Sequence, residues 1–339
     1  MPKPAPTPLP NWQLGHRPAL DGLRGIAILA VLAWHVGIPG LTGAGQAGVT
    51  LFFVLSGFLI TAILIEEHAR SGRIDFRRFY RNRAARLLPA LVVMLLAASV
   101  MVAITRPAGG AIAILGALLY VANWLQAWKV NIFPVQHTWT LSIEEQFYIA
   151  WPLLLSLLLL VRRRWALYAV VAGFLAATAL RFFFAPWAPD RALWGTDVRA
   201  DALLAGCALA LVLTRRPIRA PSALVVAAIG LFSAVLIFGS PPVLLAGGLT
   251  AVALSSMVFV LRAATMASSP LAWRPLRWIG SISYGLYLAH PLLFNAFPAV
   301  PRPVLAIVAV LVAGASARWL ERPVMRWARD GRTVGAAGR

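Results

Sequence analysis

The sequence predicts an all-α polytopic membrane protein, and three observations support that fold class. Of the 339 residues, 60% are hydrophobic and 12% are charged, and the mean hydropathy is +0.78. This composition is too apolar for a soluble protein. Arginine-rich segments separate many of the apolar runs that are long enough to cross a hydrocarbon core. These runs span residues 19–38, 47–66, 87–105, 111–128, 142–161, 165–184, 200–214, 222–239, 243–261, 279–297 and 303–320.

The arginine clusters constrain the membrane topology. Clusters follow the second, fifth, seventh, ninth and last runs, and the positive-inside rule places all of them in the cytoplasm. If all eleven runs crossed the membrane, some of these clusters would lie outside, so one run must fail to cross. Run 111–128 is the best candidate for a re-entrant segment, because it ends in the polar stretch 123–131 and joins a loop that re-enters the membrane. We predict a bundle of about ten transmembrane helices plus one re-entrant segment, with both termini cytoplasmic.

The domain organisation is expected to be simple. We expect a disordered, proline-rich N-terminus over residues 1–16, one membrane-embedded domain over residues 17–328 and a short basic tail over residues 329–339. The net charge of +20 reflects membrane orientation, since no nucleic-acid-binding module is visible and no nucleic acid partner is predicted. Cys207 lies in an apolar run and is expected to pack there, and no metal site is predicted. We expect a multi-pass protein of the inner, cytoplasmic membrane.

Arg24 and His35 stand eleven residues apart within the first apolar run. Eleven helical positions make three turns plus about 20°, so the two side chains share one helix face about 16 Å apart. An ionisable side chain in a membrane helix costs about 2.5 to 3.5 kcal/mol, so it usually faces a protein interior or a wet cavity. A functional pair is one reading. The alternative is that Arg24 snorkels to the interface while His35 bonds a carbonyl.

Two further segments carry candidate site residues. Arg83 and Arg86 share one helix face, and two guanidiniums at that spacing suit a phosphate or pyrophosphate. Membrane orientation and anionic lipid also explain such arginines. Ser56 and Gly57 lie in a run of small and aromatic residues where Gly57 permits close helix approach, although plain packing explains this run as well. Ser56 lacks the frame of a hydrolase nucleophile.

Two adjacent carboxylates, Glu144 and Glu145, enter an apolar helix. Glu145 fits a capping box, in which it would bond back to the backbone of Ser142. Glu144 has no such role, so it needs a cationic or histidine partner. We expect His35 to be that partner from the outer side of the membrane, with His137 as an alternative.

A third group of candidates follows near the end of the chain. Tyr284, Tyr287 and His290 are spaced by three residues, so they line one side of a helix and bring hydroxyls and an imidazole into the bundle. An aromatic belt at the membrane interface accounts for Tyr287 equally well.

Taken together, these segments resemble acyltransferase family 3, a family of integral membrane O-acyltransferases. The resemblance runs in order through nearly all of residues 17–328. It rests on the arginine, ten residues, histidine motif, the second helix, the basic loop with its R-x-x-R pair, the central motif and two C-terminal signatures. These match residues 20–35, 52–61, 78–89, 138–152, 283–293 and 320–324.

The resemblance implies transfer of an acyl group, usually acetyl, from acyl-CoA to a hydroxyl of a sugar, a glycan or a small metabolite. Acetyl-CoA would be a co-substrate, and no permanently bound cofactor is implied. Arg24 and His35 become the catalytic pair, with Arg83 and Arg86 on the donor phosphates and Glu144 in support. The residues agree: His35 is a natural general base near neutral pH, whereas Arg24 is too remote from it to stabilise the oxyanion. Arg24 therefore fits the phosphate end of the donor.

Other assignments stay open on the sequence alone. Ser56, Tyr284, Tyr287 and His290 are expected to complete the pocket, and Ser56 or Tyr284 could donate to the oxyanion. A transporter of an anionic solute is the main rival function, because buried charge and re-entrant backbone are also transporter features. A lipid-phosphate glycosyltransferase is the second rival.

Overall fold

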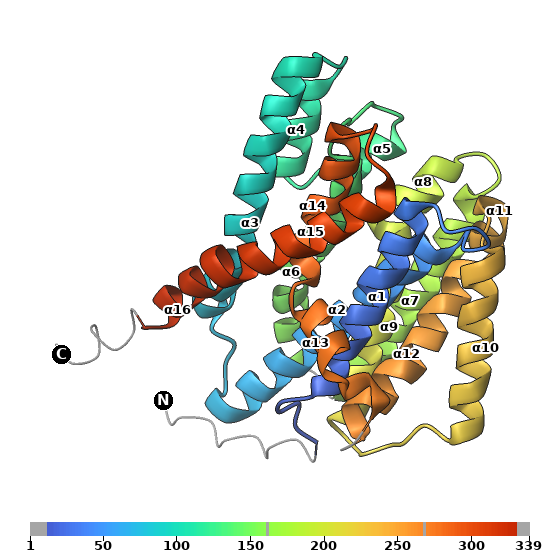
Figure 1. Cartoon of the computed structure of the whole chain (residues 1–339). Helices are drawn as coiled ribbons and strands as arrows, with labels where there is room; N and C mark the ends of the chain where they lie inside the picture. The colour runs from blue at the N-terminus through green and yellow to red at the C-terminus, as the bar shows by residue number, and fades with distance from the viewer. Residues whose placement is uncertain (1–11, 161–162, 267–268, 331–339) are drawn as a thin grey trace.

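The computed structural model describes residues 12–160, 163–266 and 269–330, and every element in this part of the chain is helical (Figure 1). The disordered N-terminus expected over residues 1–16 and the basic tail expected over residues 329–339 lie mostly outside the described residues, so both stay predictions. The first elements are α1 (Pro18–Val36), α2 (Ala44–Ser71), α3 (Phe76–Thr105), α4 (Gly110–Leu118), α5 (Ala122–Ala127), η1 (Gln136–Thr138), α6 (Trp139–Leu160), α7 (Arg163–Phe184), α8 (Pro189–Trp194) and α9 (Thr196–Leu213).

The second part of the chain completes the bundle with shorter and interrupted helices. The η1 and η3 segments are 3₁₀ turns, whereas η2 and η4 are π-helical turns within longer helices. The elements are α10 (Ser222–Phe238), α11 (Pro241–Val243), η2 (Leu244–Gly248), α12 (Leu249–Thr265), η3 (Pro270–Ala272), α13 (Arg274–Ser281), α14 (Ser283–Ala296), α15 (Arg302–Ser316), η4 (Ala317–Glu321) and α16 (Arg322–Asp330).

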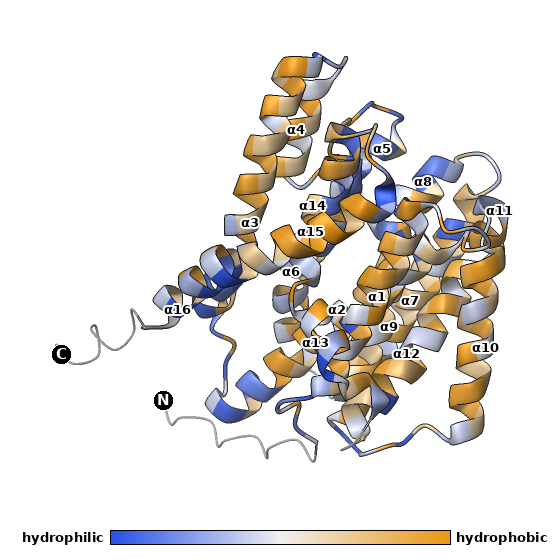
Figure 2. Cartoon of the chain, viewed as in Figure 1, coloured by the Kyte–Doolittle hydropathy of each residue, from blue (hydrophilic) through white to orange (hydrophobic). Residues whose placement is uncertain are grey.

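Seven described helical segments are long and apolar enough to cross a membrane, so the chain is a multi-pass membrane protein. Figure 2 shows hydrophobic residues along the middle of the bundle and hydrophilic residues gathered toward its ends. The count of ten crossings and the cytoplasmic termini stay predictions. The seven segments are Pro18–Val36, Ala44–Ser71, Phe76–Thr105, Gln136–Leu160, Arg164–Phe184, Pro241–Thr265 and Arg302–Ala328.

The run 111–128, which the sequence predicts to be re-entrant, is broken into two short helices. It forms α4 of 9 residues and α5 of 6 residues, with Tyr120 in a left-handed conformation (φ 55°) between them. At about 1.5 Å per residue, α4 is roughly 14 Å long, which is about half the thickness of a hydrocarbon core. Neither piece can span the membrane by itself.

Glycines let α1 lie directly against α13 and the turn before it. A Cβ atom placed on Gly22 would lie 1.8 Å from the Leu271 carbonyl oxygen, and one on Gly280 would lie 1.8 Å from the Asp21 oxygen. No larger residue fits at such distances. This close approach sets the start of α14 beside the middle of α1, and it brings Ser283 to Arg24.

A second close approach joins α2 to α9. A Cβ atom on Gly57 would lie 1.9 Å from the carbonyl oxygen of Leu203, and one on Gly206 would lie 2.1 Å from that of Val54. Cys207 is buried at the same interface, where its thiol faces the Gly57 oxygen at 3.5 Å. The close helix approach predicted at Gly57 is therefore confirmed, and Cys207 packs as expected.

Replacing Gly57 by alanine should destabilise the bundle, because the new methyl group overlaps the backbone of Leu203. Overpacking of this kind costs about 1 to 3 kcal/mol, so we expect a lower midpoint of thermal unfolding in detergent. Gly230→Ala is the matched control, since a Cβ on Gly230 in α10 meets nothing within 4 Å. Equal unfolding midpoints for the two variants would contradict the close packing of α2 on α9.

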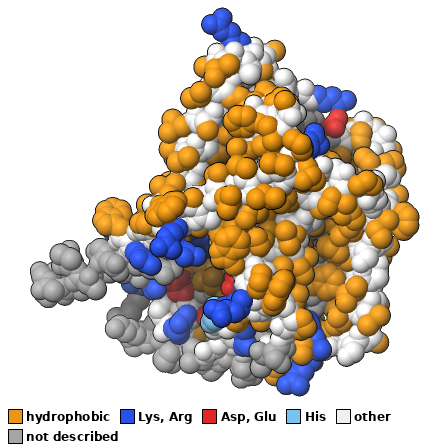
Figure 3. All heavy atoms as spheres, viewed as in Figure 1, with side chains coloured by type: hydrophobic (Ala, Val, Ile, Leu, Met, Phe, Trp, Pro, Cys, Tyr) orange, Lys and Arg blue, Asp and Glu red, His pale blue; other side chains and the backbone are white. Residues whose placement is uncertain are grey.

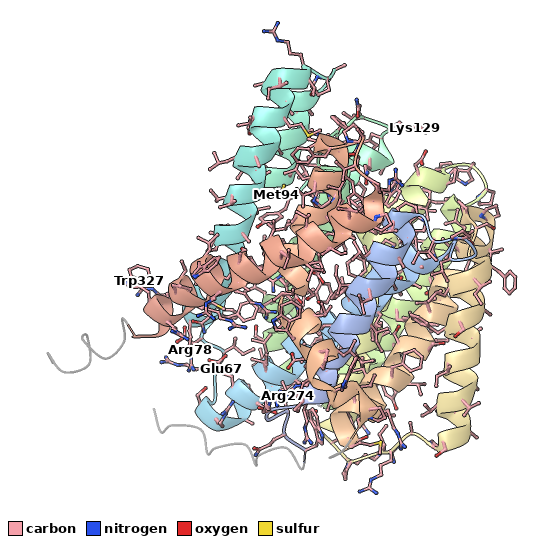
Figure 4. All side chains as sticks on the ribbon, in the orientation of Figure 1. Glu67, Arg78, Met94, Lys129, Arg274 and Trp327 are labelled. Carbon is pink, nitrogen blue, oxygen red and sulfur yellow. The ribbon has the colours of Figure 1, made fainter. Side chains whose placement is uncertain are left out.

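The arginine clusters predict that the α2–α3 loop faces the cytoplasm and that the loop after α5 faces outside. Ser71→Cys should therefore resist an impermeant thiol reagent added to intact cells, whereas Lys129→Cys should react. Lys129 is exposed and lies at the opposite end of the bundle from Arg78 (Figure 4). The native Cys207 is buried and should stay silent. Labelling of Ser71→Cys from outside would overturn the topology.

Candidate active site

A cavity of about 600 Å³ opens at one end of the bundle between α2, α3 and α16. Figure 3 shows this end as a hollow with basic side chains at its edge and acidic side chains inside it, and Figure 4 shows Arg78, one of its lining arginines, at this end. The cavity is strongly basic. Its lining includes Arg24, Arg70, Arg78, Arg83 and Arg86.

A narrower pocket of about 100 Å³ continues from this cavity into the bundle. The two spaces adjoin each other at a neck, because they share six lining residues: Arg24, Ser56, Leu59, Arg83, Arg86 and Tyr148. Beyond the neck, the inner pocket is lined by Glu144, Thr140 and Tyr287, among others. The arrangement is a wide basic mouth that leads into a thin channel.

Arg24 lies at the neck with part of its hydrogen-bonding capacity unused. One terminal nitrogen, Nη2, donates to the Ser283 hydroxyl at 3.1 Å, whereas the Nε atom is buried without a partner among the described residues. Five N–H donors on a guanidinium can satisfy an anion from several directions. Arg24 therefore offers free donors to a ligand that passes through the neck.

Arg83 is held by an acid and an aromatic ring from α6. Its Nε atom lies 3.0 Å from both carboxylate oxygens of Glu145, its Nη2 atom completes the ion pair, and its Cζ atom lies 3.3 Å from the centre of the Tyr148 ring. The expected capping role of Glu145 is therefore wrong. The helix begins before Ser142, at Trp139 after a 3₁₀ turn, so Ser142 cannot be its N-cap. The Ser142 hydroxyl donates to the Thr138 carbonyl at 3.1 Å instead.

Glu144 accepts a hydrogen bond from Ser56, with 2.6 Å between Oε1 and the hydroxyl oxygen. Both residues line the inner pocket beside Arg24. The expected contact between Glu144 and His35 is therefore wrong. Glu144 lies along α6 on the side of the neck, whereas the ring of His35 is occupied by a different partner.

That partner is His290, and the two histidines form a pair at the far end of α1. The Nε2 atom of His290 lies 3.3 Å from Nδ1 of His35, and the two rings meet edge to face with centroids 4.7 Å apart. The Nδ1 atom of His35 also lies 2.9 Å from the Val31 carbonyl oxygen. Arg302 donates to the His35 backbone oxygen at 3.0 Å, which ties the end of α1 to the start of α15.

Tyr287 connects the inner pocket with the histidine pair. Its side chain lines the pocket, and its ring centre lies 5.9 Å from that of His290. Its hydroxyl donates to the His137 carbonyl at 2.8 Å and accepts from Thr140 at 2.8 Å. Tyr287 is therefore built into the wall between the channel and the histidines.

The structure brings most of the predicted site residues together in one place. The inner pocket is lined by Arg24, Ser56, Arg83, Arg86, Glu144, Tyr284 and Tyr287. Neither His35 nor His290 lines it, since both lie beyond Tyr287. Among the described residues, no group of three or more histidine, cysteine or acidic side chains is placed to hold a metal ion.

Sequence reasoning missed Tyr148 at the neck and Ser283 in the inner pocket. Tyr148 stands four residues after Glu144 and so shares its helix face, which is a signal that helical spacing could have given. Ser283 stands four residues before Tyr287 in the same way. Their partners, Arg83 and Arg24, are distant in sequence, and no local pattern indicates those contacts.

Comparison with known proteins gives the family. The profile of the acyltransferase domain, Acyl_transf_3, matches residues 17–317. The peptidoglycan O-acetyltransferase OatA of Listeria monocytogenes is 33% identical, covering 91% of this chain and 56% of OatA. YrhL of Bacillus subtilis, provisionally named a peptidoglycan O-acetyltransferase, is 34% identical, covering 91% of this chain and 54% of YrhL.

The chain thus spans about half the length of these two relatives. Provisionally named O-acetyltransferases of Staphylococcus aureus are 37% identical, over 58% of this chain and 35% of theirs. No solved structure matches. Because the profile match covers most of the sequence and carries the residues of the neck and both histidines, the chain belongs to acyltransferase family 3.

Proposed function

We propose that this protein transfers an acyl group, acetyl in the simplest case, from acyl-CoA to a hydroxyl of a glycan at the bacterial cytoplasmic membrane. One observation carries the proposal. The basic mouth narrows through the neck into a thin channel that ends at Tyr287, against which the His35–His290 pair lies. A donor with phosphates at one end and a thioester on a long arm at the other fits this shape.

The charges of the mouth suit the phosphates of coenzyme A. Arg86 is exposed and makes no ion pair with an acid among the described residues, and Arg24 keeps a buried Nε donor free. Arg83 is different, because Glu145 already neutralises it. We therefore assign Arg24 and Arg86 to direct phosphate contact, with Arg83 shaping the neck and offering its remaining donors.

The spacing of Arg24 and His35 along α1 suits the pantetheine arm. Arg24 and His35 lie about 16 Å apart along α1, a distance that an extended thin arm bridges. In the proposed step, Nε2 of His35 takes the proton of the acceptor hydroxyl while the oxygen attacks the thioester carbon. The carbon–sulfur bond then breaks, and the CoA thiolate leaves with the proton returned by the imidazolium. General-base catalysis of this kind contributes about 10²- to 10⁴-fold in rate.

The relatives indicate the class of acceptor. OatA is named for the O-acetylation of peptidoglycan, which is a glycan rich in secondary and primary hydroxyls. We propose an acceptor of the same chemical class for this chain, reached from the end of α1 that carries His35. The two rival functions, solute transport and glycosyl transfer, gain no support from the family match.

Arg86→Lys should raise the KM for acetyl-CoA, because lysine cannot reproduce the bidentate contact of a guanidinium with phosphate. Arg83→Lys should raise it as well, since it also releases Glu145. Arg274→Lys is the control: Arg274 is exposed and starts α13, and it lines neither space of the cavity. Steady-state assay of thiol release would show the effect. An unchanged KM for acetyl-CoA in both variants would mean that Arg83 and Arg86 only orient the helix in the membrane.

His35→Ala should lower kcat by about 10² to 10⁴ through loss of the general base. Binding of CoA, measured by calorimetry on the purified protein, should stay nearly intact, because the phosphate end of the cavity is formed by other residues. Purified protein in detergent, acetyl-CoA and a chito-oligosaccharide as the acceptor probe suffice for the assay. A His35→Ala enzyme that keeps most of its activity would place the base elsewhere.

A further inference from the structure

We infer that His290 is a positioning residue that, together with the Val31 carbonyl, fixes the tautomer of His35 and accepts a hydrogen bond from its imidazolium. The inference rests on the proposed role of His35 as the general base. Its starting point is the pair itself: Nε2 of His290 lies 3.3 Å from Nδ1 of His35, and His290 is fully buried.

The tautomer of His290 follows from its other contact. Its Nδ1 atom lies 2.8 Å from the carbonyl oxygen of Leu286, one turn earlier in α14. A carbonyl oxygen can only accept, so Nδ1 of His290 carries the proton. In a neutral ring the second nitrogen then holds a lone pair, and Nε2 of His290 faces His35 as an acceptor.

The same reasoning fixes His35. Its Nδ1 atom lies 2.9 Å from the Val31 carbonyl oxygen and 3.3 Å from the lone pair on His290. Both neighbours are acceptors, so Nδ1 of His35 must be the protonated nitrogen. The lone pair of His35 is thereby placed on Nε2, which is the nitrogen available to take a proton from a hydroxyl.

Once Nε2 of His35 has taken that proton, the ring is a half-buried imidazolium that lies against the rings of Trp34 and His290. Its Nδ1–H then donates to the lone pair of His290, and a hydrogen bond from a charged donor is stronger than one between neutral groups. His290 occupies the place that a carboxylate takes in a serine, histidine, aspartate triad. It orients the base and stabilises the charged form without carrying a charge of its own.

Two amide variants separate this role from plain packing. In His290→Gln the side-chain oxygen can reach the position of Nε2 and accept from His35, so most of kcat should remain. In His290→Asn the shorter side chain reaches only the Nδ1 position. It can still donate to Leu286, but it removes the ring nitrogen that accepts from His35 and leaves the Val31 carbonyl as the one remaining acceptor of the Nδ1–H among the described residues. We expect His290→Asn to lower kcat by about ten- to a hundredfold, because the free energy of a hydrogen bond to a charged group corresponds to a rate factor of about that size.

The control is Phe294→Leu, because Phe294 packs edge to face on His290, with ring centroids 5.9 Å apart, and its side chain has no group that can donate or accept a hydrogen bond. This variant should keep the kcat of the native protein. The KM for acetyl-CoA should be unchanged in all three variants, since the donor phosphates lie at the opposite end of the cavity.

The assay is the one described for His35, with acetyl-CoA and a chito-oligosaccharide probe. Equal losses in His290→Gln and His290→Asn, or native kcat in His290→Asn, would overturn the inference. A large loss in Phe294→Leu would do the same. The double variant His35→Ala/His290→Asn should be no slower than His35→Ala alone, because residues that act as one unit are not additive. Retained activity in His35→Ala would instead remove the base assignment itself.

Discussion

The cost of placing charge inside an apolar bundle is the constraint on which the rest of this structure depends. Each ionisable side chain within the membrane is costly unless it faces water or a partner. The chain meets that cost in two places. Around the cavity Arg83 pairs with Glu145 and Arg24 bonds Ser283, and away from it the fully buried Arg181 pairs with Asp201. Glu144, which has no cation within ion-pair distance, is satisfied by Ser56 instead. One of these two groups of charges therefore lines the cavity, where Arg24 and Arg83 lie at the neck.

The neck also depends on backbone contacts that carry no polar chemistry. Gly22 and Gly280 allow α1 and α13 to touch, and this contact sets the first turn of α14 against the middle of α1. One helix then presents Arg24 to Ser283 at its near end and His35 to His290 at its far end. Since α1 and α14 run side by side between the two contacts, a shift at the glycines would move the Arg24–Ser283 contact and the histidine pair together.

Helical periodicity was enough to place Arg24 with His35 on one face and Tyr284, Tyr287 and His290 on another, because those relations lie within single helices. It could not find their partners. Ser283 is 259 residues from Arg24, and His290 is 255 residues from His35, so only the packing of α1 on α14 brings them together. The capping box at Ser142 failed for a related reason: the local pattern was correct, but the 3₁₀ turn over residues 136–138 had already started the helix.

In the proposed mechanism, the use of a second histidine beside His35, at the place that a carboxylate takes in a serine, histidine, aspartate triad, follows from the same constraint on charge. A carboxylate beside the base would be an additional buried ion in the resting state, and its desolvation would cost several kcal/mol before any gain in the transition state. A neutral imidazole needs only its hydrogen bonds, and Leu286 supplies one of them from within α14. It accepts from the imidazolium when the charge appears, and it carries no charge in the resting state. In a membrane, a weaker orienting group that needs no counter-ion is therefore the better solution, and the helix carbonyls of Val31 and Leu286 supply the orientation that a carboxylate would otherwise give.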